Sequence, residues 1–255
     1  MRIFVPVKQV PDLVEELEVD ASGTDLDRQW LTYKLNEFDD HALEEALLLK
    51  EEAGGEVVVA ALDSDVADDI LYTALAKGAD RALKIPAGDG PASSHAVARI
   101  MAEVARSVEA DIILTGVQAA DDLHGQNGPL IAGYLDLPHV SVVTSVRPSG
   151  QAVEVHQEYA GGLTARIEVD LPAVLGIQAA RQSPRYVPVS RVRQAMKEGR
   201  IDSLAAAGGA DGSVPAVRRV FKPESAGRAE MIDGSTQVVV DRLLEILNER
   251  GLVRA

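Results

Sequence analysis

Short, almost uninterrupted apolar runs alternate with segments of helical periodicity through the first half of the chain, and this alternation restricts the fold most. The apolar runs cover residues 3–7, 57–62, 82–85 and 111–115, whereas the polar residues 8–28 predict an irregular excursion. Parallel strands need helical crossovers, and strands covered on both faces are apolar at nearly every position. The sequence therefore predicts an α/β fold with a doubly wound, mostly parallel sheet.

The segments between these runs carry start and stop signals of helices. Asp39 or Asp40 is expected to cap the first helix, and Gly54 is placed to end it. Ser64 is expected to cap the second helix, and Gly78 is placed to end that one. The turns after the first, second and fourth apolar runs should then share one edge of the sheet, where such folds bind ligands.

The pattern changes after Pro138, where apolar stretches follow one another at short intervals with glycine-rich turns and no helix between them. Closely spaced strands of this kind predict an antiparallel extension of the same sheet. We expect residues 1–204 to form one α/β nucleotide-binding domain with this extension. The expected strands of the extension are residues 140–146, 152–158, 164–169 and 173–177.

Residues 205–255 are expected to form a C-terminal arm that ends in a helix. Residues 205–230 are rich in Ala, Gly, Pro and Ser, a composition typical of a linker rather than a core element. Ser235 is placed to cap an amphipathic helix, whose apolar stripe must be buried against this domain or another subunit. The stripe consists of Val239, Leu243, Ile246 and Leu247.

Composition excludes several classes of function. The 255 residues contain no cysteine, which excludes thiol catalysis and iron–sulfur ligation and is compatible with the cytoplasmic location that we expect. A net charge of −15 argues against a nucleic-acid partner. The chain starts as a strand rather than a signal peptide, and no apolar run approaches the ~20 residues of a membrane helix, so we expect no membrane insertion.

The sequence also lacks familiar catalytic and metal-binding patterns. Its five histidines have no metal-ligand spacing, so no metal site is expected. Neither GxGxxG after the first strand nor GxxxxGK[ST] occurs, and nothing resembles a nucleophile with its base. We therefore expect no catalytic residue in this chain.

One strand-to-helix turn carries the chemistry of a binding site, in ILTGVQAADDLHGQNGPLIAGYLDLP over residues 113–138. The first amides of a helix lack intrahelical partners and favour an anion, and glycines let the backbone approach a ligand. Gln126 and Asn127 can donate amide hydrogen bonds to phosphate or sugar oxygens. Asp121 and Asp122 would repel a phosphate and suit ribose hydroxyls or the orientation of the loop. A plain glycine-rich connection, with a solvent-facing His124, remains the alternative.

Five segments together resemble the β (small) subunit of electron transfer flavoproteins. The resemblance covers residues 1–204 and continues into the terminal helix. No single segment is specific for the family, but the order and spacing of the five segments are. The segments are FVPVKQVPD, LNEFDDHALEEALLLKE, LYTALAKGADRAL, DIILTGVQAADDLHGQNGPLIAGYLDLP and LPAVLGIQAARQSPRY.

The resemblance implies a fold of the adenine-nucleotide-hydrolase-like type and an electron carrier subunit rather than an enzyme. It implies a heterodimer with an α subunit, which makes most contacts to a shared, redox-active FAD. The β subunit of this family holds a structural AMP, or a second FAD in electron-bifurcating members. Electrons pass from dehydrogenases, such as acyl-CoA dehydrogenases, to a membrane quinone reductase or another acceptor.

The resemblance also assigns residues by position. The cofactor-binding residues that it implies are Pro6, Asn36, Glu37, Phe38, Asp39, Leu62, Gly116, Val117, Gln118, Ala119, Ala120, Asp121, Asp122, Leu123, His124, Gly125, Gln126 and Asn127. The partner-binding residues are Tyr186, Val189, Val239, Leu243, Ile246 and Leu247.

Several positions depart from the family pattern. Pro6 stands where alanine is usual, Val117 where a basic residue is common, and Val189 where the acyl-CoA-dehydrogenase-linked members have an anchoring leucine. QEYAGG replaces RExDGG, and QSPRY replaces NEPRY. These changes leave the identity of the electron donor open.

The choice between AMP and a second FAD rests on residues 121–129, which read DDLHGQNGP. AMP-type members of the family have DDxxNQTGQ in this turn, and bifurcating members have DGDTAQVGP. This chain shares features with both patterns. Asp122 and Asn127 match the AMP type, whereas Gly125 and the Gly128–Pro129 pair lean toward a second FAD. We weigh the carboxylate of Asp122 more heavily, because unpaired like charge beside a phosphate is costly. An independent ATP-binding or nucleotide-hydrolysing protein and an interaction module with a vestigial pocket remain the alternatives.

Overall fold

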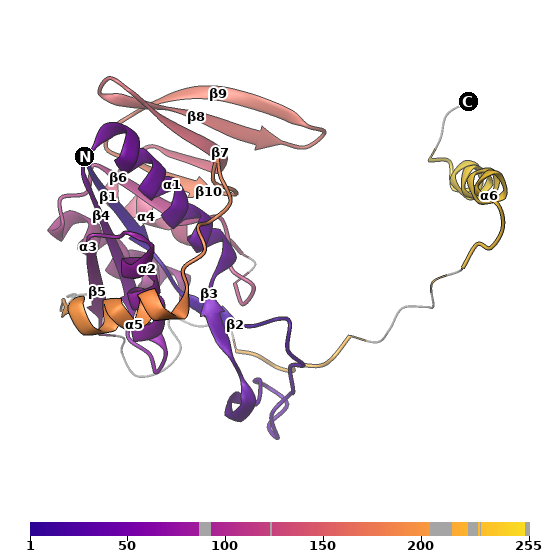
Figure 1. The fold of residues 1–255 in the computed structure, drawn as a ribbon, viewed down its shortest axis with the longest axis horizontal. Helices are drawn as coiled ribbons and strands as arrows, with labels where there is room; N and C mark the ends of the chain where they lie inside the picture. Colours follow the sequence, from indigo (N-terminus) through magenta and orange to yellow (C-terminus); the bar gives the residue numbers. More distant parts are fainter. Residues whose placement is uncertain (87–92, 123, 205–215, 224–228, 230, 253–255) are drawn as a thin grey trace.

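A nine-stranded sheet with helices on both faces forms the body of the molecule (Figure 1). The structure is a computed structural model that describes residues 1–86, 93–122, 124–204, 216–223, 229 and 231–252. In spatial order the strands are β11 (Ile201–Ser203), β5 (Arg81–Ile85), β4 (Glu56–Leu62), β1 (Arg2–Pro6), β6 (Ile112–Gly116), β10 (Ala173–Ile177), β7 (His139–Ser149), β8 (Ala152–Tyr159) and β9 (Leu163–Asp170).

The helices divide the core into two layers, one on each face of the sheet. The first layer joins α1 and α2 to side chains such as Ile3, Val57 and Leu114, whereas the second joins α3 and α4 to Phe4, Val58 and their neighbours. Alternate residues of one strand enter opposite layers, because side chains alternate across a sheet. The doubly wound, mostly parallel fold is confirmed. The helices are α1 (Glu37–Ala53), α2 (Ala67–Lys77), α3 (Ser94–Ser107), α4 (Asn127–Leu135) and α5 (Val189–Glu198).

The predicted antiparallel extension is correct for three strands and wrong for the fourth. β7 pairs antiparallel with β8, and β8 with β9. β10, however, lies between β6 and β7 and runs parallel to both. All five of its residues are buried, as in the other central strands, because the sheet is covered on both faces at this position.

Two predicted helix caps are also wrong, although Gly54 and Gly78 do follow the ends of α1 and α2. Asp39 lies inside the first turn of α1, where its buried carboxylate binds backbone outside the helix. Ser64 precedes α2 by more than one residue, and its hydroxyl accepts a hydrogen bond from the Gln9 side chain at 2.7 Å. In both cases a tertiary contact takes the oxygen that a cap would use.

A small second sheet has one strand inside the predicted irregular excursion of residues 8–28 and its other strand after it. β2 (Gln9–Pro11) pairs antiparallel with β3 (Tyr33–Leu35), and a single 3-10 turn, η1 (Arg28–Trp30), lies before β3. These strands have three residues each, too few for the alternation of apolar and polar residues to show in the sequence.

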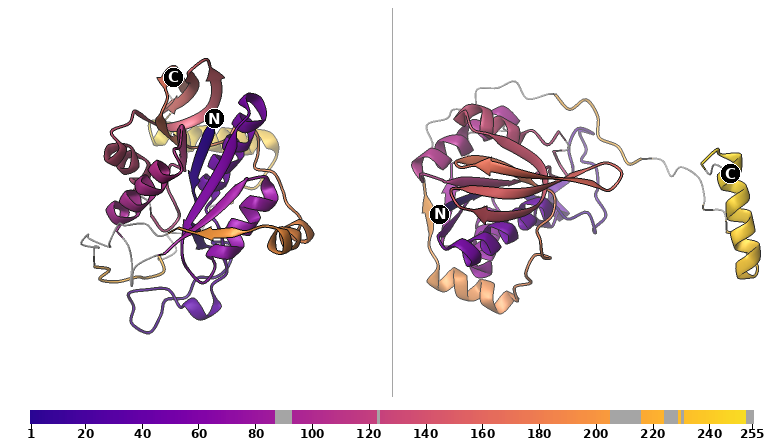
Figure 2. Two further views of the ribbon diagram at one scale, coloured as in Figure 1. Left: turned by 90° about the vertical axis from the view of Figure 1, so that its left-hand side faces the viewer. Right: turned by 90° about the horizontal axis from the view of Figure 1, so that it is seen from above.

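The last helix, α6 (Thr236–Glu249), lies apart from the body, as Figure 1 and the right-hand view of Figure 2 show. Ser235 caps it as predicted, since its side chain accepts from the amide of Val238. No residue of α6 is buried. The predicted domain boundary at residue 205 lies outside the described residues and stays a prediction. Within the described ranges, no helix has the length and apolar character that crossing a membrane requires.

Candidate functional site

The carboxyl ends of three neighbouring strands meet at one edge of the sheet. β1 lies between β4 and β6 and is parallel to both, so Pro6, Leu62 and Gly116 end side by side. The first turn of α1 and the loop of residues 117–126 lie at the same edge, as the hydrogen bonds below show. We call this region the strand-end site. The expectation that the three turns share one edge of the sheet is confirmed.

Asp39 joins two of these strand ends. Its carboxylate accepts hydrogen bonds from the backbone amides of Lys8, at 3.0 Å, and Gly116, at 3.2 Å. Gly116 has no room for a side chain, because a Cβ atom there would collide with Asp39 and Phe38. Burial of the Asp39 carboxylate raises its pKa to about 7, and the hydrogen bonds from Lys8, Asn36 and Gly116 offset only part of this effect.

Asn36 joins α1 to the loop of residues 117–126. It is the N-cap residue of α1, but its side chain makes no capping hydrogen bond. The amide nitrogen instead donates to the carbonyl oxygen of Gln118 at 2.9 Å, across 82 positions of sequence. Asn36 is buried, so this bond fixes the start of the loop against the start of α1.

The two adjacent aspartates orient the loop. Asp121 pairs with the ammonium group of Lys8 at 2.7 Å. The backbone amides of Ala119 and Asp122 each donate to the carbonyl of the other, and the Asp122 carboxylate accepts from the amide of His124 at 3.2 Å. Of the two roles considered from the sequence, orientation of the loop therefore has direct support.

Two glycines of this turn have no room for a side chain. Gly125 has a φ of +60°, and a Cβ atom there would lie 2.6 Å from the carbonyl oxygen of Val117. Gly128 is buried in the first turn of α4, where a Cβ atom would lie 2.8 Å from the hydroxyl of Thr115 and 3.2 Å from Nε2 of His139. Both glycines therefore have a reason in the fold itself.

Polar atoms without a hydrogen-bond partner gather at the start of α4. Among the described residues, buried atoms of this kind include Thr115 Oγ1, Asn127 Oδ1 and His139 Nε2. Thr115 is 3% exposed, and burial lowers the pKa of His139, which favours its neutral form. A buried polar atom without a partner costs about 1–3 kcal/mol. The same place offers the first amides of a helix, so the hydroxyl of Thr115 and the imidazole of His139 fit the phosphate end of a nucleotide, whereas Asn127 Oδ1 is an acceptor and does not.

Neither Thr115 nor His139 was among the residues predicted from the sequence. Thr115 left a signal there, because it is a hydroxyl residue in an otherwise apolar strand that ends at the candidate turn. His139 left none, since the approach of β7 to the start of α4 is a tertiary contact. Lys8 was missed for the same reason.

The remaining predicted residues lie around the edge of the strand-end site. Pro6, Phe38, Leu62 and Val117 are partly exposed, and Ala119 is buried. Leu123 lies outside the described residues. The exposed members of the predicted set are Glu37, Gln118, Ala120, Asp121, His124 and Gln126.

The predicted partner-binding residues lie away from the strand-end site. Tyr186 is 86% exposed and Val189 is 64% exposed, at the start of α5. The four stripe residues of α6 are partly or fully exposed, with Leu243 at 46%. Their exposure leaves them available to a partner.

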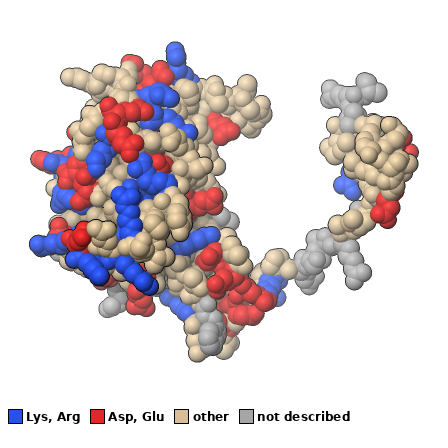
Figure 3. Space-filling view, viewed as in Figure 1, with Lys and Arg blue, Asp and Glu red and all other residues tan. Residues whose placement is uncertain are grey.

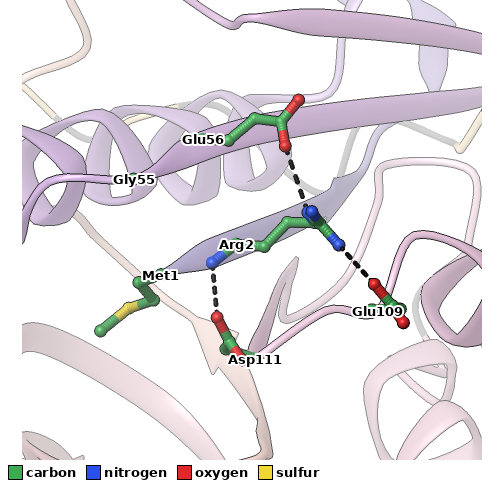
Figure 4. A pocket seen from close by; sticks show the side chains of 6 residues that line it. All are labelled: Met1, Arg2, Gly55, Glu56, Glu109 and Asp111. Carbon is green, nitrogen blue, oxygen red and sulfur yellow. Dashed lines mark hydrogen bonds and ion pairs between the residues drawn. The ribbon is translucent and has the colours of Figure 1, made fainter.

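A shallow pocket of about 450 Å³ lies at the opposite end of the strands (Figure 4). The guanidinium group of Arg2 binds Glu56 and Glu109 there, and the Arg2 amide donates to Asp111. Gly55 has no room for a Cβ atom because of the carbonyl of Met1. The charged groups in this pocket satisfy one another, so it joins the amino ends of the strands and offers no free ligand group. The described residues contain no cluster of potential metal ligands.

The fold and the strand-end site place the chain among the α/β proteins that bind ligands at the carboxyl ends of parallel strands. The electron transfer flavoprotein domain family matches residues 25–208. The electron transfer flavoprotein subunit beta of Methylophilus methylotrophus is 37% identical over 98% of both chains. The human protein of the same name is 32% identical over 78% of this chain and 79% of its own, and protein FixA of Azorhizobium caulinodans is 32% identical over 98% and 95%. The chain belongs to the electron transfer flavoprotein β-subunit family.

Proposed function

We propose that this chain is the β subunit of a heterodimeric electron transfer flavoprotein and binds AMP at the strand-end site. It works with an α subunit, shares the redox-active FAD with that subunit, and passes electrons from flavin-dependent dehydrogenases to a quinone reductase or another acceptor. Membership of the family supports the electron-transfer role. The chain acts as a carrier and holds no catalytic residue of its own.

The observation that carries the nucleotide proposal is the group of unpartnered polar atoms at the start of α4. The Thr115 hydroxyl and the His139 imidazole lie there beside Gly128, together with the first helical amides. A phosphate oxygen accepts hydrogen bonds from hydroxyl, amide and imidazole donors and suits the positive end of the helix dipole. The adenine end of the nucleotide would lie toward Pro6 and Leu62, where two strands end.

The structure bears on the choice between AMP and a second FAD. In the sequence, Gly125 and Gly128 favoured a second FAD. The fold explains why glycine occupies both positions, because Gly125 has a positive φ and Thr115 lies close to Gly128. Neither glycine therefore argues for extra space. The carboxylate of Asp122 stays beside the loop, where it disfavours the second phosphate of a dinucleotide. These points support AMP.

The test is the nucleotide content of the purified heterodimer. We expect one FAD and one AMP per heterodimer after release and chromatographic separation. Two FAD per heterodimer would contradict the proposal of bound AMP and favour a bifurcating protein. One FAD without AMP would favour an interaction module with a vestigial pocket.

A pair of glycine variants locates the bound nucleotide. Gly125→Ala places a Cβ atom against Val117 in a left-handed backbone, so it should lower the AMP content and leave the FAD content unchanged. Gly133→Ala is the matched control, because a Cβ atom there meets nothing within 4 Å and alanine favours a helix. Equal AMP content in the two variants would place the nucleotide elsewhere.

A further inference from the structure

The segment between β10 and α5, residues 178–188, contains no helix or strand, yet hydrogen bonds fix it along its length. The amide of Gln178 donates to the carbonyl of Val143 at 2.8 Å. The amide of Ala180 then donates to His41 Nδ1 at 3.2 Å. The next two fixed amides, at Arg181 and Arg185, donate to side chains of α1 as well. We call residues 178–188 the tethered segment.

Two adjacent glutamates of α1 hold the second half of the tethered segment. Glu45 accepts from the Arg181 amide at 2.9 Å and from Arg181 Nε at 2.7 Å. Glu44 accepts from the Arg185 amide at 2.9 Å and from Arg185 Nε and Nη2, both at 2.9 Å. Each glutamate therefore binds both the backbone and the side chain of one arginine, which fixes the direction of the segment as well as its place.

Two further glutamates extend this contact along the same face of α1. Arg185 also pairs with Glu51 at 3.0 Å, and Arg181 also pairs with Glu52. Positions that differ by seven in a helix lie on one face two turns apart. The acidic face of α1 thus matches the two arginines of the tethered segment, which lie 141 and 136 positions from their glutamates.

These ion pairs are buried at their inner ends. The side chain of Glu45 is fully buried and that of Glu44 is 4% exposed. Burial would raise the pKa of Glu44, but its hydrogen bonds with Arg185 outweigh burial and hold the pKa below its ordinary value. Removal of one partner from a buried pair leaves an uncompensated charge, so such pairs hold a segment firmly.

The end of the tethered segment and the start of α5 are exposed. Tyr186 comes directly after Arg185 and is 86% exposed, and Val189 opens α5 at 64% exposed. No residue of α5 is buried, and Arg191, Arg193 and Lys197 are exposed on it. Lys and Arg side chains accordingly cover much of this face of the body, interleaved with carboxylates (Figure 3).

We propose that Glu44 and Glu45 are positioning residues, which hold Tyr186 and Val189 in place through Arg185 and Arg181 so that an electron donor can dock. This inference rests on the proposed electron-transfer function. A surface whose residues are already fixed loses less conformational entropy when a partner binds. The buried ion pairs supply that rigidity where the chain has neither helix nor strand.

The first test measures the position of Val189 in the full chain. The native sequence has no cysteine, so Val189→Cys and Gly133→Cys can carry two spin labels for distance measurement by pulsed electron resonance. We expect a narrow distance distribution in the otherwise native chain and a broad one after Glu44→Gln. Lys50→Gln is the matched control, because Lys50 lies on the same helix and pairs with Asp80 at 2.6 Å, away from the tethered segment. An unchanged distribution after Glu44→Gln would overturn the proposal.

The second test separates docking from electron transfer in the heterodimer, with a flavin-dependent acyl-CoA dehydrogenase as the donor probe. Glu44→Gln should raise the KM for the dehydrogenase by roughly tenfold and leave kcat unchanged, because only encounter with the donor is impaired. Arg185→Lys keeps the charge but loses the planar fork, so it should give an intermediate KM and serves if Glu44→Gln does not fold. A broad distance distribution with an unchanged KM would overturn the docking role.

A wild-type heterodimer whose FAD is reduced by dithionite but by no dehydrogenase would contradict the proposed electron-transfer function instead. The spin-label distances do not depend on the donor. They would still decide whether Glu44 and Glu45 position the exposed residues.

Discussion

Asp39 is a carboxylate whose surroundings oppose its charge. It is 7% exposed and accepts from the amides of Lys8 and Gly116, and the charge of Lys8 offsets part of the effect of burial. Burial raises its pKa from an ordinary value of 3.8 to about 7. The carboxyl group is thus partly protonated near neutral pH while it joins two strand ends of the candidate site.

The raised pKa of Asp39 gives the stability of the fold a specific pH dependence. Between about pH 4 and pH 7 the folded state holds a proton that the unfolded state has released, so stability falls as the pH rises through this window. One group contributes at most about 1.4 kcal/mol per pH unit. Asp39→Asn should remove this slope, as measured by urea unfolding at pH 4.5, 5.5, 6.5 and 8.

The difference between the wild type and Asp39→Asn isolates this group from the other carboxylates. Asp69→Asn is the control, because Asp69 is exposed on α2. Its unfolding free energy should parallel that of the wild type across the series. Parallel profiles for Asp39→Asn as well would show that Asp39 is ionised in the folded state throughout this range.

At the scale of elements, α1 links the two functional regions. Its first turn carries Asn36 and Asp39, which bind the loop and strand ends of the candidate site. One to two turns later it carries Glu44 and Glu45, which hold the tethered segment before α5. One helix therefore sets the position of both the loop of residues 117–126 and the exposed start of α5.

Val189 tests how much that exposed start contributes to docking. Val189→Ala removes two methyl-sized groups, and burial of each is worth about 0.8 kcal/mol, so the KM for the donor should rise by no more than about fifteenfold. Val14→Ala is the matched control, since Val14 is 87% exposed and lies outside both α5 and the arm. Loss of nearly all electron transfer in a folded Val189→Ala protein would refute this weak dependence and make Val189 the main anchor.

At the scale of the whole molecule, α6 stands apart with its apolar side chains exposed. Val238, Val240, Leu243 and Leu244 are each more than 40% exposed. Before α6, the amide of Val220 donates to the carbonyl of Gly23, and Lys222 pairs with Glu16 and Glu18. Residues 216–223 thus lie against the acidic excursion of the body, and α6 beyond them has an unburied apolar surface that suits a partner subunit.

A chain that ends after Leu204 tests whether the arm and α6 hold the α subunit. The body should remain folded, since its core clusters lie before this point and the ion pairs lost are exposed and weak. Its affinity for the α subunit should fall until no heterodimer survives gel filtration. A chain that ends after Leu252 is the control and should assemble normally. A full-affinity heterodimer without the arm would show that the body alone makes the interface.

The sequence determined the local elements and the class of fold. The buried strands were predictable because a strand covered on both faces must be apolar throughout. The ends of α1 and α2 were predictable because Gly54 and Gly78 suit a helix end. The glycines and amides of the turn before α4 indicated a ligand site, and this assignment stays a prediction. The family was recognisable because five segments kept their order and spacing.

Only the tertiary structure decided which elements and side chains meet. The apolar residues of β10 predict a strand but not its neighbours in the sheet. Its place between β6 and β7 depends on partners that are far away in the sequence. The position of Asp39 in the sequence predicts a helix cap. Its carboxylate instead binds the backbone amides of Lys8 and Gly116, which are 31 and 77 residues away. Local periodicity reports which face of an element is buried, whereas pairing is decided by the packing of the whole chain, which no short stretch of sequence encodes.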